Sequence, residues 1–595
     1  MTAAMLDDFV SQSHIAYFSM EIALRTDIPT YAGGLGILAG DTMRSAADLD
    51  LPMVAVSLVS RAGYFRQELD GQGRQIEHPA IWDPAGFAFP LHAKICVLIE
   101  DRLVWIGGWL YVLASHMGGQ KPVILLDTDL QDNRPEDRAI THYLYGGDDR
   151  YRLMQETVLG IGGVRMLNAL GFNIRQYHLN EGHSALLTLE LMRRETYAAQ
   201  DLQPGEPVYD VPRVRALCNF TTHTPLEAGH DRFSYDLVRR VLPNVIADGA
   251  ANPPAAATGP LPGQTGSQER AIDLATVKHL AGAENLNMTR LALNLSEYVN
   301  GVAKRHAKVS RDMFPGYRVH AITNGVHPFT WTCESFRKLY DEYLPGWCHE
   351  PELLVRAECC IADAAIWQAH RDAKQRLIEK VHSLTSTSLD PAAPIFGFAR
   401  RMTPYKRPDL IFADIERLKA IAREHPFQIV MAGKAHPRDT EGKALIEMLH
   451  AKAQALSGSV PVVFLADYDM AMAQWLVAGV DVWLNTPQAP LEASGTSGMK
   501  AAFNGVPSLS VLDGWWIEGC IEGVTGWAIG KVETDGDETA RRLYEKLEQV
   551  VLPLFYRNGS DPLPWIRIMK GAISRNASYF NSHRMMRRYA TEAYL

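Results

Sequence analysis

Short apolar runs that alternate with helix-period segments constrain the fold of this chain more than any other feature. Each run has the length of a strand, and the segment that follows it has the apolar spacing of a helix. The runs form two sets, at residues 15–20, 53–59, 123–126, 216–221 and 319–323, and then at 395–399, 428–432, 462–465, 480–484 and 508–512. Strands separated by helices predict a parallel α/β sheet, so two sets predict two such sheets.

The domain organisation follows from these two sets. The 595 residues are too many for one ordinary core, and we predict two doubly wound, Rossmann-like domains that face each other across a deep cleft. Residues 323–328 (TNGVHP) lie between the sets and are rich in turn residues. We therefore place an N-terminal domain at residues 1–324 and a C-terminal domain at 325–595, with the last helices as candidates to pack back on the N-terminal domain.

Composition excludes several classes of partner. The net charge of −9 argues against a nucleic-acid-binding surface, and the apolar runs are too short to cross a bilayer. The N-terminus has no basic segment followed by an apolar one, so we expect no signal peptide. Seven cysteines without CxxC spacing are typical of reduced thiols. We predict a cytoplasmic protein without a nucleic-acid or membrane partner.

Residues 248–270 are rich in Pro, Ala and Gly and nearly free of large apolar residues. This composition predicts a mobile surface loop, with a functional lid as the alternative.

One lysine, Lys500, follows a run of five small residues at 494–498. A short helix is expected over residues 499–503, with Thr496 or Ser497 as its N-cap, which puts Lys500 in the first turn. Helix N-termini attract anions, so we expect a phosphate here. The same partial charge lowers the pKa of a lysine and favours the neutral amine that condenses with an aldehyde. Phosphate and aldehyde together suggest pyridoxal 5′-phosphate (PLP).

On these residues alone, two alternatives to a PLP site stay open. One is a nucleotide-phosphate cradle, although the GxxxxGK[ST] pattern of a P-loop is absent. The other is an ordinary glycine-rich turn with a solvated lysine.

The order of residues in this segment resembles that of a known protein family. EASGTSGMK, followed by NG and VLDG, resembles the cofactor-lysine segment of the α-glucan phosphorylases, the glycogen, starch and maltodextrin phosphorylase family. The resemblance extends from about Tyr17 to Gly519, and the chain is similar to compact prokaryotic members. It implies a GT-B-type architecture, PLP bound at Lys500, and retaining phosphorolysis of the non-reducing end of an α-1,4-glucan by inorganic phosphate, which releases α-D-glucose 1-phosphate. It also implies a homodimer, and we expect no nucleotide effector site of the animal kind.

A glycine loop, Gly33-Gly34-Leu35-Gly36, follows the first apolar run. Glycines let the backbone approach a ligand closely, although a tight turn explains them equally well. The resemblance implies that the backbone of Gly33, Gly34 and Leu35 contacts the substrate phosphate and sugar, and that Gly34 also borders the cofactor. Retaining glycogen and starch synthases have a related loop.

Four cations lie within residues 400–407, directly after an apolar run. A solvated charged face is the simple alternative. Two phosphates ~5 Å apart, however, repel by roughly 3 kcal/mol per unit-charge pair at an effective dielectric of 20, and guanidinium and ammonium groups offset this repulsion. The resemblance implies that Arg401 and Lys406 hold the substrate phosphate and that Arg400 holds the cofactor phosphate.

Two histidine-containing segments, 178–183 and 221–225, match no zinc spacing, and HExxH is absent, so we predict no metal site. The resemblance implies instead that His223 contacts the glucosyl unit in the catalytic pocket. It further implies cofactor contacts from Thr496 and Gly498, and substrate contacts from Asn324, Tyr468, Glu492, Ser494 and Gly495. Asn324 is equally explained by an Asn-Gly turn. The pair at 515–516 is either a sugar-stacking platform or core tryptophans, and Glu156 is interpreted as structural.

No pair of acidic residues stands out as the acid and nucleophile of a glycosidase. The resemblance implies that inorganic phosphate serves as proton donor and nucleophile, that the cofactor phosphate exchanges protons with it, and that Lys500 anchors the cofactor. Two other functions remain in competition: a nucleotide-sugar-dependent glucan synthase and a non-catalytic glucan-binding protein.

Overall fold

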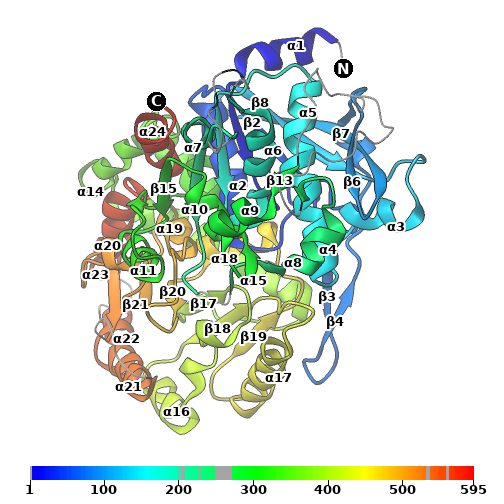
Figure 1. Cartoon of the computed structure of the whole chain (residues 1–595). Coiled ribbons are helices and arrows are strands. Elements are labelled where there is room, and N and C mark those ends of the chain that lie inside the picture. The colour runs from blue at the N-terminus through cyan, green and yellow to red at the C-terminus, as the bar shows by residue number, and fades with distance from the viewer. Residues whose placement is uncertain are drawn as a thin grey trace.

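The structure, a computed structural model, describes residues 3–197, 200, 202, 208–226, 229–247, 271–530, 536–557 and 562–595. It has a mixed α/β fold with two large sheets rich in parallel strands (Figure 1). The predicted loop at 248–270 lies outside the described residues.

The first sheet belongs to the N-terminal half and is parallel from β16 to β8. Its order is β16-β15-β10-β9-β1-β2-β8-β7-β5, and β7 runs antiparallel to β8 and β5. Its strands are β1 (Ile15–Phe18), β2 (Met53–Leu58), β5 (Phe89–Pro90), β6 (Ile95–Ile99, paired with β7), β7 (Arg102–Ala114), β8 (Gln120–Asp127), β9 (Gln176–Asn180), β10 (Cys218–Thr222), β15 (Tyr298–Gly301) and β16 (His320–Ala321). β1 and β2 are buried at every position, which explains their unbroken apolar sequence.

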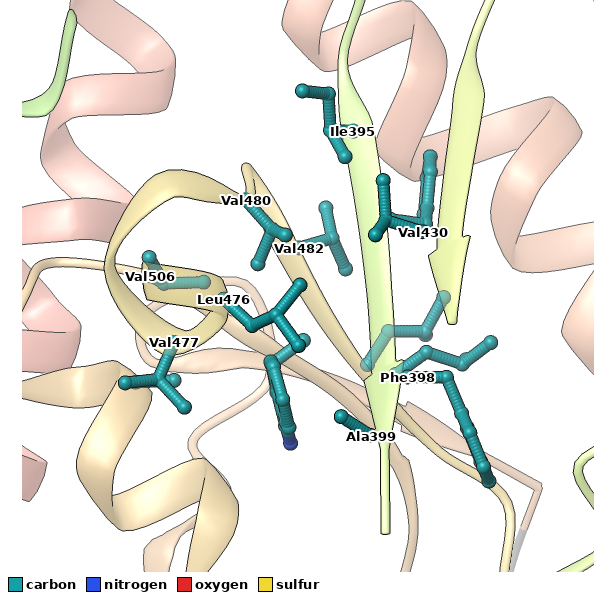
Figure 2. Packing of buried hydrophobic residues seen from close by; sticks show 14 of the residues in the cluster. Ile395, Phe398, Ala399, Val430, Leu476, Val477, Val480, Val482 and Val506 are labelled. Carbon is teal, nitrogen blue, oxygen red and sulfur yellow. The ribbon is translucent and has the colours of Figure 1, made fainter. Parts of the chain in front are cut away.

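The second sheet is parallel throughout, in the order β19-β18-β17-β20-β21-β22. Its strands are β17 (Ile395–Ala399), β18 (Gln428–Ala432), β19 (Val462–Leu465), β20 (Val482–Asn485), β21 (Ser508–Val511) and β22 (Gly526–Ile529). Figure 2 shows Leu476 of helix α18 (Met470–Gly479) pointing toward Phe398 and Ala399 of β17. Burial of these side chains fixes the helix on the sheet.

Helices cover both sheets. Those of the N-terminal half are α1 (Ala3–Gln12), α2 (Gly34–Asp48), α3 (Pro135–Arg138), α4 (Asp149–Thr157), α5 (Gly163–Ala169), α6 (Leu186–Arg194), α7 (Val211–Leu217), α8 (Tyr235–Val241), α9 (Leu274–Ala281), α10 (Met288–Asn294) and α11 (Lys304–Met313). Besides α18, those of the C-terminal half are α12 (Pro328–Trp331), α13 (Glu334–Tyr343), α14 (Ala357–Cys360), α15 (Asp363–Thr385), α16 (Ile415–Glu424), α17 (Thr440–Ala455), α19 (Ser497–Ala502), α20 (Trp516–Gly519), α21 (Gly536–Lys546), α22 (Leu552–Tyr556), α23 (Leu563–Gly571) and α24 (Ser582–Glu592).

The minor strands are β3 (Arg66–Leu69), β4 (Gln75–His78), β11 (Arg232–Ser234), β12 (Ile246–Ala247), β13 (Ile272–Asp273) and β14 (Asn285–Asn287). None of the helices in the described part of the chain is long and apolar enough to cross a membrane. All seven cysteines are described, and none of them forms a disulfide.

The predicted α/β class with parallel sheets is confirmed, and one apolar run was misassigned in part. In the run 216–221, the first residues finish α7 and the strand begins at Cys218. Helix α7 starts at Val211, where the Asp210 side chain caps it by accepting from the N–H of Arg213. The boundary at residue 324 stays a prediction.

Helix α24 and the β3–β4 hairpin are among the elements that join the halves of the molecule. Helix α24 returns from the C-terminal half and packs on α2, where Ser45 Oγ and Ser582 Oγ lie 2.5 Å apart. In the other direction, the β3–β4 hairpin reaches the C-terminal half, and α17 packs against β4 (Figure 1). Gln67 Nε2 donates to Gly433 O at 3.0 Å, and Gln75 Nε2 donates to Ala435 O at 2.9 Å.

Candidate functional site

The candidate residues follow the carboxyl ends of parallel strands in both sheets. Glu21 follows β1 and His223 follows β10 in the first sheet, while Arg400 follows β17 and Asp513 follows β21 in the second. Open α/β sheets bind ligands at these edges, so the topology itself gathers the site.

The glycine loop is held from behind by Glu21. Its Oε2 accepts from Ala32 N at 2.6 Å and from Gly33 N at 3.1 Å. A Cβ on Gly36 would lie 2.6 Å from the same oxygen, so this position requires glycine. Around Gly34, by contrast, no described atom lies within 4 Å of an added Cβ. Gly34 and Leu35 open α2, and the first N–H groups of a helix lack intrahelical partners.

The cation cluster surrounds one buried carboxylate, Glu492. Its Oε2 lies 2.6 Å from Lys406 Nζ and 2.8 Å from Arg400 Nη2. Burial raises the pKa of Glu492, but the charges of Arg400 and Lys406 outweigh burial and lower it below its usual range. Arg400 Nε and Nη1 are buried and meet no hydrogen-bond partner in the described residues. Two cations thus share one carboxylate, and Arg400 keeps two donors that are unused among the described residues.

The other two arginines of the cluster behave differently. Arg401 is exposed, and its Nη2 lies 3.5 Å from the Cβ position of Gly33, so it reaches from the second sheet to the glycine loop of the first. Arg407 instead donates to the backbone oxygens of Thr486 and Pro487. Arg407 therefore serves the local backbone rather than a ligand.

Lys500 is buried in α19 with its Nζ 3.9 Å from the centroid of the Trp331 ring. Burial lowers the pKa of Lys500 to about 8, although the nearby Asp41 carboxylate acts in the opposite direction. Trp331 is held in turn, because its Nε1 donates to Asp41 Oδ2 at 2.7 Å and Asn504 Nδ2 donates to its carbonyl. Near pH 8, about half of the Lys500 amine is therefore in its neutral form.

The lysine loop differs from its prediction in its helix start. The helix begins at Ser497 instead of Met499, and Thr496 makes no side-chain cap, so Lys500 is its fourth residue. Ser497 Oγ accepts instead from the indole N–H of Trp483 at 3.0 Å. A buried indole N–H requires an acceptor. The Ser497 hydroxyl fills this role and does not cap the helix.

Small residues of this loop are required by close packing. A Cβ on Gly498 would lie 2.8 Å from Ser508 Oγ, and Gly495 has φ +78° with its Cβ position 3.2 Å from Glu492 Cγ. Ser494 Oγ is buried, and the described chain offers it no hydrogen-bond partner. Thr496 O accepts from Lys500 N at 3.2 Å. The loop thus joins the lysine to the cation cluster and leaves a buried hydroxyl free.

A hydrogen-bond chain leads from His223 to the glycine loop. His223 Nε2 lies 2.6 Å from Asn180 Oδ1, Asn180 Nδ2 donates to Ser19 Oγ, and Ser19 Oγ donates to Glu21 O. Burial lowers the pKa of His223 well below its ordinary value, so the ring is neutral. Glu181 accepts from the His223 N–H at 2.7 Å and fixes the backbone. His223 is thereby a positioned, uncharged ring whose Nε2–H is donated to Asn180 and whose Nδ1 is left as an acceptor.

Asn324 and Tyr468 are placed by their neighbours. The backbone N–H of Asn324 donates to Val302 O and its carbonyl accepts from Arg584, whereas its buried Oδ1 has no partner among the described residues. Tyr468 follows β19; burial and then the neighbouring Tyr31 raise its pKa, so the phenol keeps its proton. The turn explanation of Asn324 therefore leaves its buried oxygen unexplained.

Two further sequence alternatives concern residues beside the site. Trp515 and Trp516 are 2% and 1% exposed and belong to the core, which excludes a sugar-stacking platform. Glu156 is buried, and Arg152 Nε lies 3.5 Å from its carboxylate. Its structural role stays a prediction.

Sequence reasoning missed Glu21, Trp331 and Asp513. Glu21 and Asp513 each follow an apolar run, so a search for carboxylates after predicted strands finds both. Asp513 accepts from the Glu492 N–H at 2.7 Å, and burial raises its pKa to about 6. Trp331 lies far from Lys500 in the sequence, and no local spacing indicates it.

A cavity of about 330 Å³ lies between the two halves of the chain, on the side of Glu21 that faces Tyr145. Its aromatic lining comes mainly from the N-terminal half, with Tyr64, Phe65, Tyr143 and Tyr145, and its far wall contains His436, Pro437 and Arg438. Tyr145 Oη donates to Glu21 Oε1 at 2.9 Å, which connects the cavity to the glycine loop. Aromatic walls with a few polar groups are typical of ligand clefts.

Comparison with known proteins gives a consistent family. The family model described as "Phosphorylase: Carbohydrate phosphorylase" matches residues 170–526. The chain is 38% identical to maltodextrin phosphorylase of Thermococcus litoralis, with 98% of this chain and 70% of that protein covered. It is 35% identical to glycogen phosphorylase of Aquifex aeolicus, with 98% and 86% covered. It is 36% identical to glycogen phosphorylase of Mycobacterium tuberculosis, with 98% and 70% covered.

Proposed function

The chain belongs to the carbohydrate phosphorylase family, and we propose that it is a glycosyltransferase that phosphorolyses α-1,4-glucans such as glycogen and maltodextrin. Inorganic phosphate is the second substrate and α-D-glucose 1-phosphate the product. One observation carries the proposal: the loop that holds the buried, low-pKa Lys500 also holds Glu492, around which Arg400 and Lys406 gather.

The residues around Lys500 fit PLP. A buried amine with a lowered pKa suits covalent attachment of the cofactor, and Arg400 Nε, Arg400 Nη1 and Ser494 Oγ are buried polar atoms that lack partners within the described residues. We propose that Lys500 tethers PLP, that Arg400 holds its phosphate, and that Gly34, Thr496 and Gly498 border it. When bound, PLP supplies a phosphate that exchanges a proton with the substrate phosphate.

The substrate phosphate is proposed to lie between the two halves of the chain. Arg401 and Lys406 offset its charge, and the first-turn N–H groups of Gly34 and Leu35, with Gly33 beside them, face it from the other side. Lys406 already contacts Glu492, so its ammonium group is in position before phosphate binds to it. Little reorganisation is then needed.

The glucosyl unit is proposed to be positioned by uncharged donors and acceptors. His223, which is neutral, binds a sugar hydroxyl without adding positive charge where an oxocarbenium-like sugar develops. The free Oδ1 of Asn324, together with Tyr468, Glu492, Ser494 and Gly495, completes the contacts. The aromatic cavity lined by Tyr64 and Tyr145 receives the remaining glucan.

The finer assignments are part of the same proposal. The two parallel-rich sheets and the family support a GT-B-type architecture. We also propose a homodimer and a cytoplasmic location.

Phosphate-dependent release of glucose 1-phosphate from maltodextrins tests this function directly. Absorbance of bound PLP and borohydride trapping at Lys500 test the cofactor separately. Protein that binds no PLP and releases no glucose 1-phosphate contradicts the proposal. Glucose transfer from a nucleotide sugar in the same assay indicates a glucan synthase instead.

A further inference from the structure

Three side chains from distant parts of the chain meet in a buried cluster outside the candidate active site. Asp48 ends α2, His327 precedes α12 and His583 lies in α24. Asp48 Oδ2 lies 2.7 Å from His327 Nε2 and 2.8 Å from His583 Nε2, and the three ligand atoms lie within 4.8 Å of one another. The side chains are 1%, 4% and 0% exposed, so the cluster is shielded from bulk water.

Each of the three side chains is also held at its outer atom. His583 Nδ1 lies 3.1 Å from the backbone oxygen of His349. His327 Nδ1 accepts from the Thr330 N–H at 3.2 Å and lies 2.7 Å from Thr330 Oγ1. Ser115 Oγ donates to Asp48 Oδ1. A histidine that binds a metal donates its other ring N–H to a partner, as His583 does. For His327 to bind an ion through Nε2, its ring proton must move to Nδ1 and be donated to Thr330 Oγ1.

The proton count at His583 asks for a positive charge in the cluster. Its Nδ1 must carry a hydrogen to bond the His349 carbonyl. A hydrogen bond from Nε2 to the Asp48 carboxylate requires a second hydrogen on the same ring. A metal ion between Nε2 and the carboxylate supplies the charge and leaves His583 as a neutral ligand.

The cluster lies where the chain crosses between its two halves. Val326 and Asn581 form a parallel bridge, and a Cβ on Gly325 would lie 2.1 Å from Asn581 O, so the two crossing segments touch. His327 and His583 follow these segments directly, and Asp48 ties both to the N-terminal half. A ligand at this cluster therefore fastens both crossings at once.

We propose that Asp48, His327 and His583 form a site for one divalent transition-metal ion of the Zn²⁺ class, which pins the hinge between the two halves of the molecule. Two imidazoles and one carboxylate are ligands that Zn²⁺ accepts, whereas Mg²⁺ and Ca²⁺ prefer oxygen alone. A fourth position is left for water.

The geometry is close to that of an occupied site. Tetrahedral ligands at 2.0–2.1 Å from Zn²⁺ are about 3.3 Å from one another, while the Asp48 oxygen and each Nε2 are 2.7 and 2.8 Å apart. Binding therefore needs each Nε2 to move roughly half an ångström away from the Asp48 oxygen, while the two Nε2 atoms lie within 4.8 Å of each other. It releases the Nε2 proton of His583 and moves that of His327 to Nδ1.

Sequence reasoning predicts no metal site because it tests local spacings. Here 279 residues separate Asp48 from His327 and 535 separate it from His583. Only the fold brings these ligands together.

Titration of the chelator-treated, full-length protein with Zn²⁺ tests the proposal. We expect about one tightly bound Zn²⁺ per chain by elemental analysis, and a higher melting temperature with Zn²⁺ than with chelator. Asp48→Asn keeps the shape and a hydrogen-bond acceptor, and we expect it to weaken Zn²⁺ binding by at least about tenfold. The wild-type titration needs no variant, so it remains informative if Asp48→Asn fails to fold.

His349→Gln is the matched control. The His349 side chain is exposed, and only its backbone oxygen contacts the cluster. This variant should bind Zn²⁺ as the wild type does. Wild-type protein that takes up no stoichiometric Zn²⁺, or Asp48→Asn protein that binds it unchanged, overturns the proposal and leaves a hydrogen-bonded cluster.

Discussion

Lys500 Nζ lies 3.9 Å from the centroid of the Trp331 ring, so the amine proposed to anchor the cofactor faces an indole. The ring face favours the ammonium form, but burial has the larger effect and lowers the pKa of Lys500 to about 8. Asp41, which accepts from the Trp331 indole, is the carboxylate that moderates this fall. The pKa of the Lys500 amine is thus about 8, so the amine changes charge close to neutral pH.

The reactivity of Lys500 should reflect this pKa. In cofactor-free protein, modification of Lys500 by an amine-directed reagent, followed by peptide mass spectrometry, should reach half its maximal rate at about pH 8. The neutral amine is the reactive form, so the rate rises with pH through this value. Lys308, which is exposed, serves as the reference in the same digest. A Lys500 midpoint above pH 10 contradicts the assigned burial effect.

Arg401 should govern phosphate affinity. Its guanidinium reaches the glycine loop from the opposite half of the chain, and a charge-assisted contact contributes about 1.5–3 kcal/mol. Arg401→Gln should therefore raise the KM for phosphate by roughly 10–100-fold while PLP absorbance is retained. Arg423→Gln, which removes an exposed cation from α16, controls for net charge. An unchanged phosphate KM in Arg401→Gln removes the residue from the phosphate site.

How much of this site is accessible from sequence depends on how local the signal is. The Ser494–Lys500 loop and the Arg400–Arg407 cluster are contiguous, so their residue types indicate anion binding without any structure. The predicted strands are found in the structure, because parallel strands that are buried on both faces have continuous apolar sequences, as in β1 and β17. The helix start at Ser497 differs from the prediction, because the Ser497 hydroxyl, an expected cap, accepts from the Trp483 indole instead.

Long-range partners escape sequence reasoning for a physical reason. Trp331 and Lys500, or Asp48 and His583, meet only after two sheets and their connections have packed. The sharing of Glu492 by Arg400 and Lys406 is of the same kind, because nothing in the sequence says which carboxylate balances the cluster.

Glu492→Gln should make stability depend on phosphate. The substitution leaves Arg400 and Lys406 buried without their carboxylate, and breaking such a pair costs about 3–5 kcal/mol. We expect a lower melting temperature than in the wild type without phosphate, and a larger rise in melting temperature when phosphate is added. Scanning fluorimetry over a phosphate series measures both effects. Equal phosphate responses in the two proteins would show that the anion lies elsewhere.

Gly36→Ala should uncouple the glycine loop from its support. The new Cβ would lie 2.6 Å from Glu21 Oε2, so Glu21 must move and loses its bonds to the N–H groups of Ala32 and Gly33. We expect phosphorolysis to fall by at least about tenfold, since two charge-assisted hydrogen bonds that shape the loop are lost, while circular dichroism and PLP content remain as in the wild type.

Gly86→Ala is the matched control for this change, because no described atom lies within 4 Å of its Cβ position. Glu21→Asp in the Gly36→Ala background shortens the carboxylate side chain by one methylene and relieves its contact with the new methyl group, while the contact with Tyr31 Cβ at 2.7 Å remains. This double variant should recover part of the activity, since the shorter carboxylate still faces Ala32 N. If Glu21→Asp gives no recovery, the loss does not act through the Glu21 contact alone, and if Gly86→Ala is as damaging as Gly36→Ala, the loss is not specific to the glycine loop.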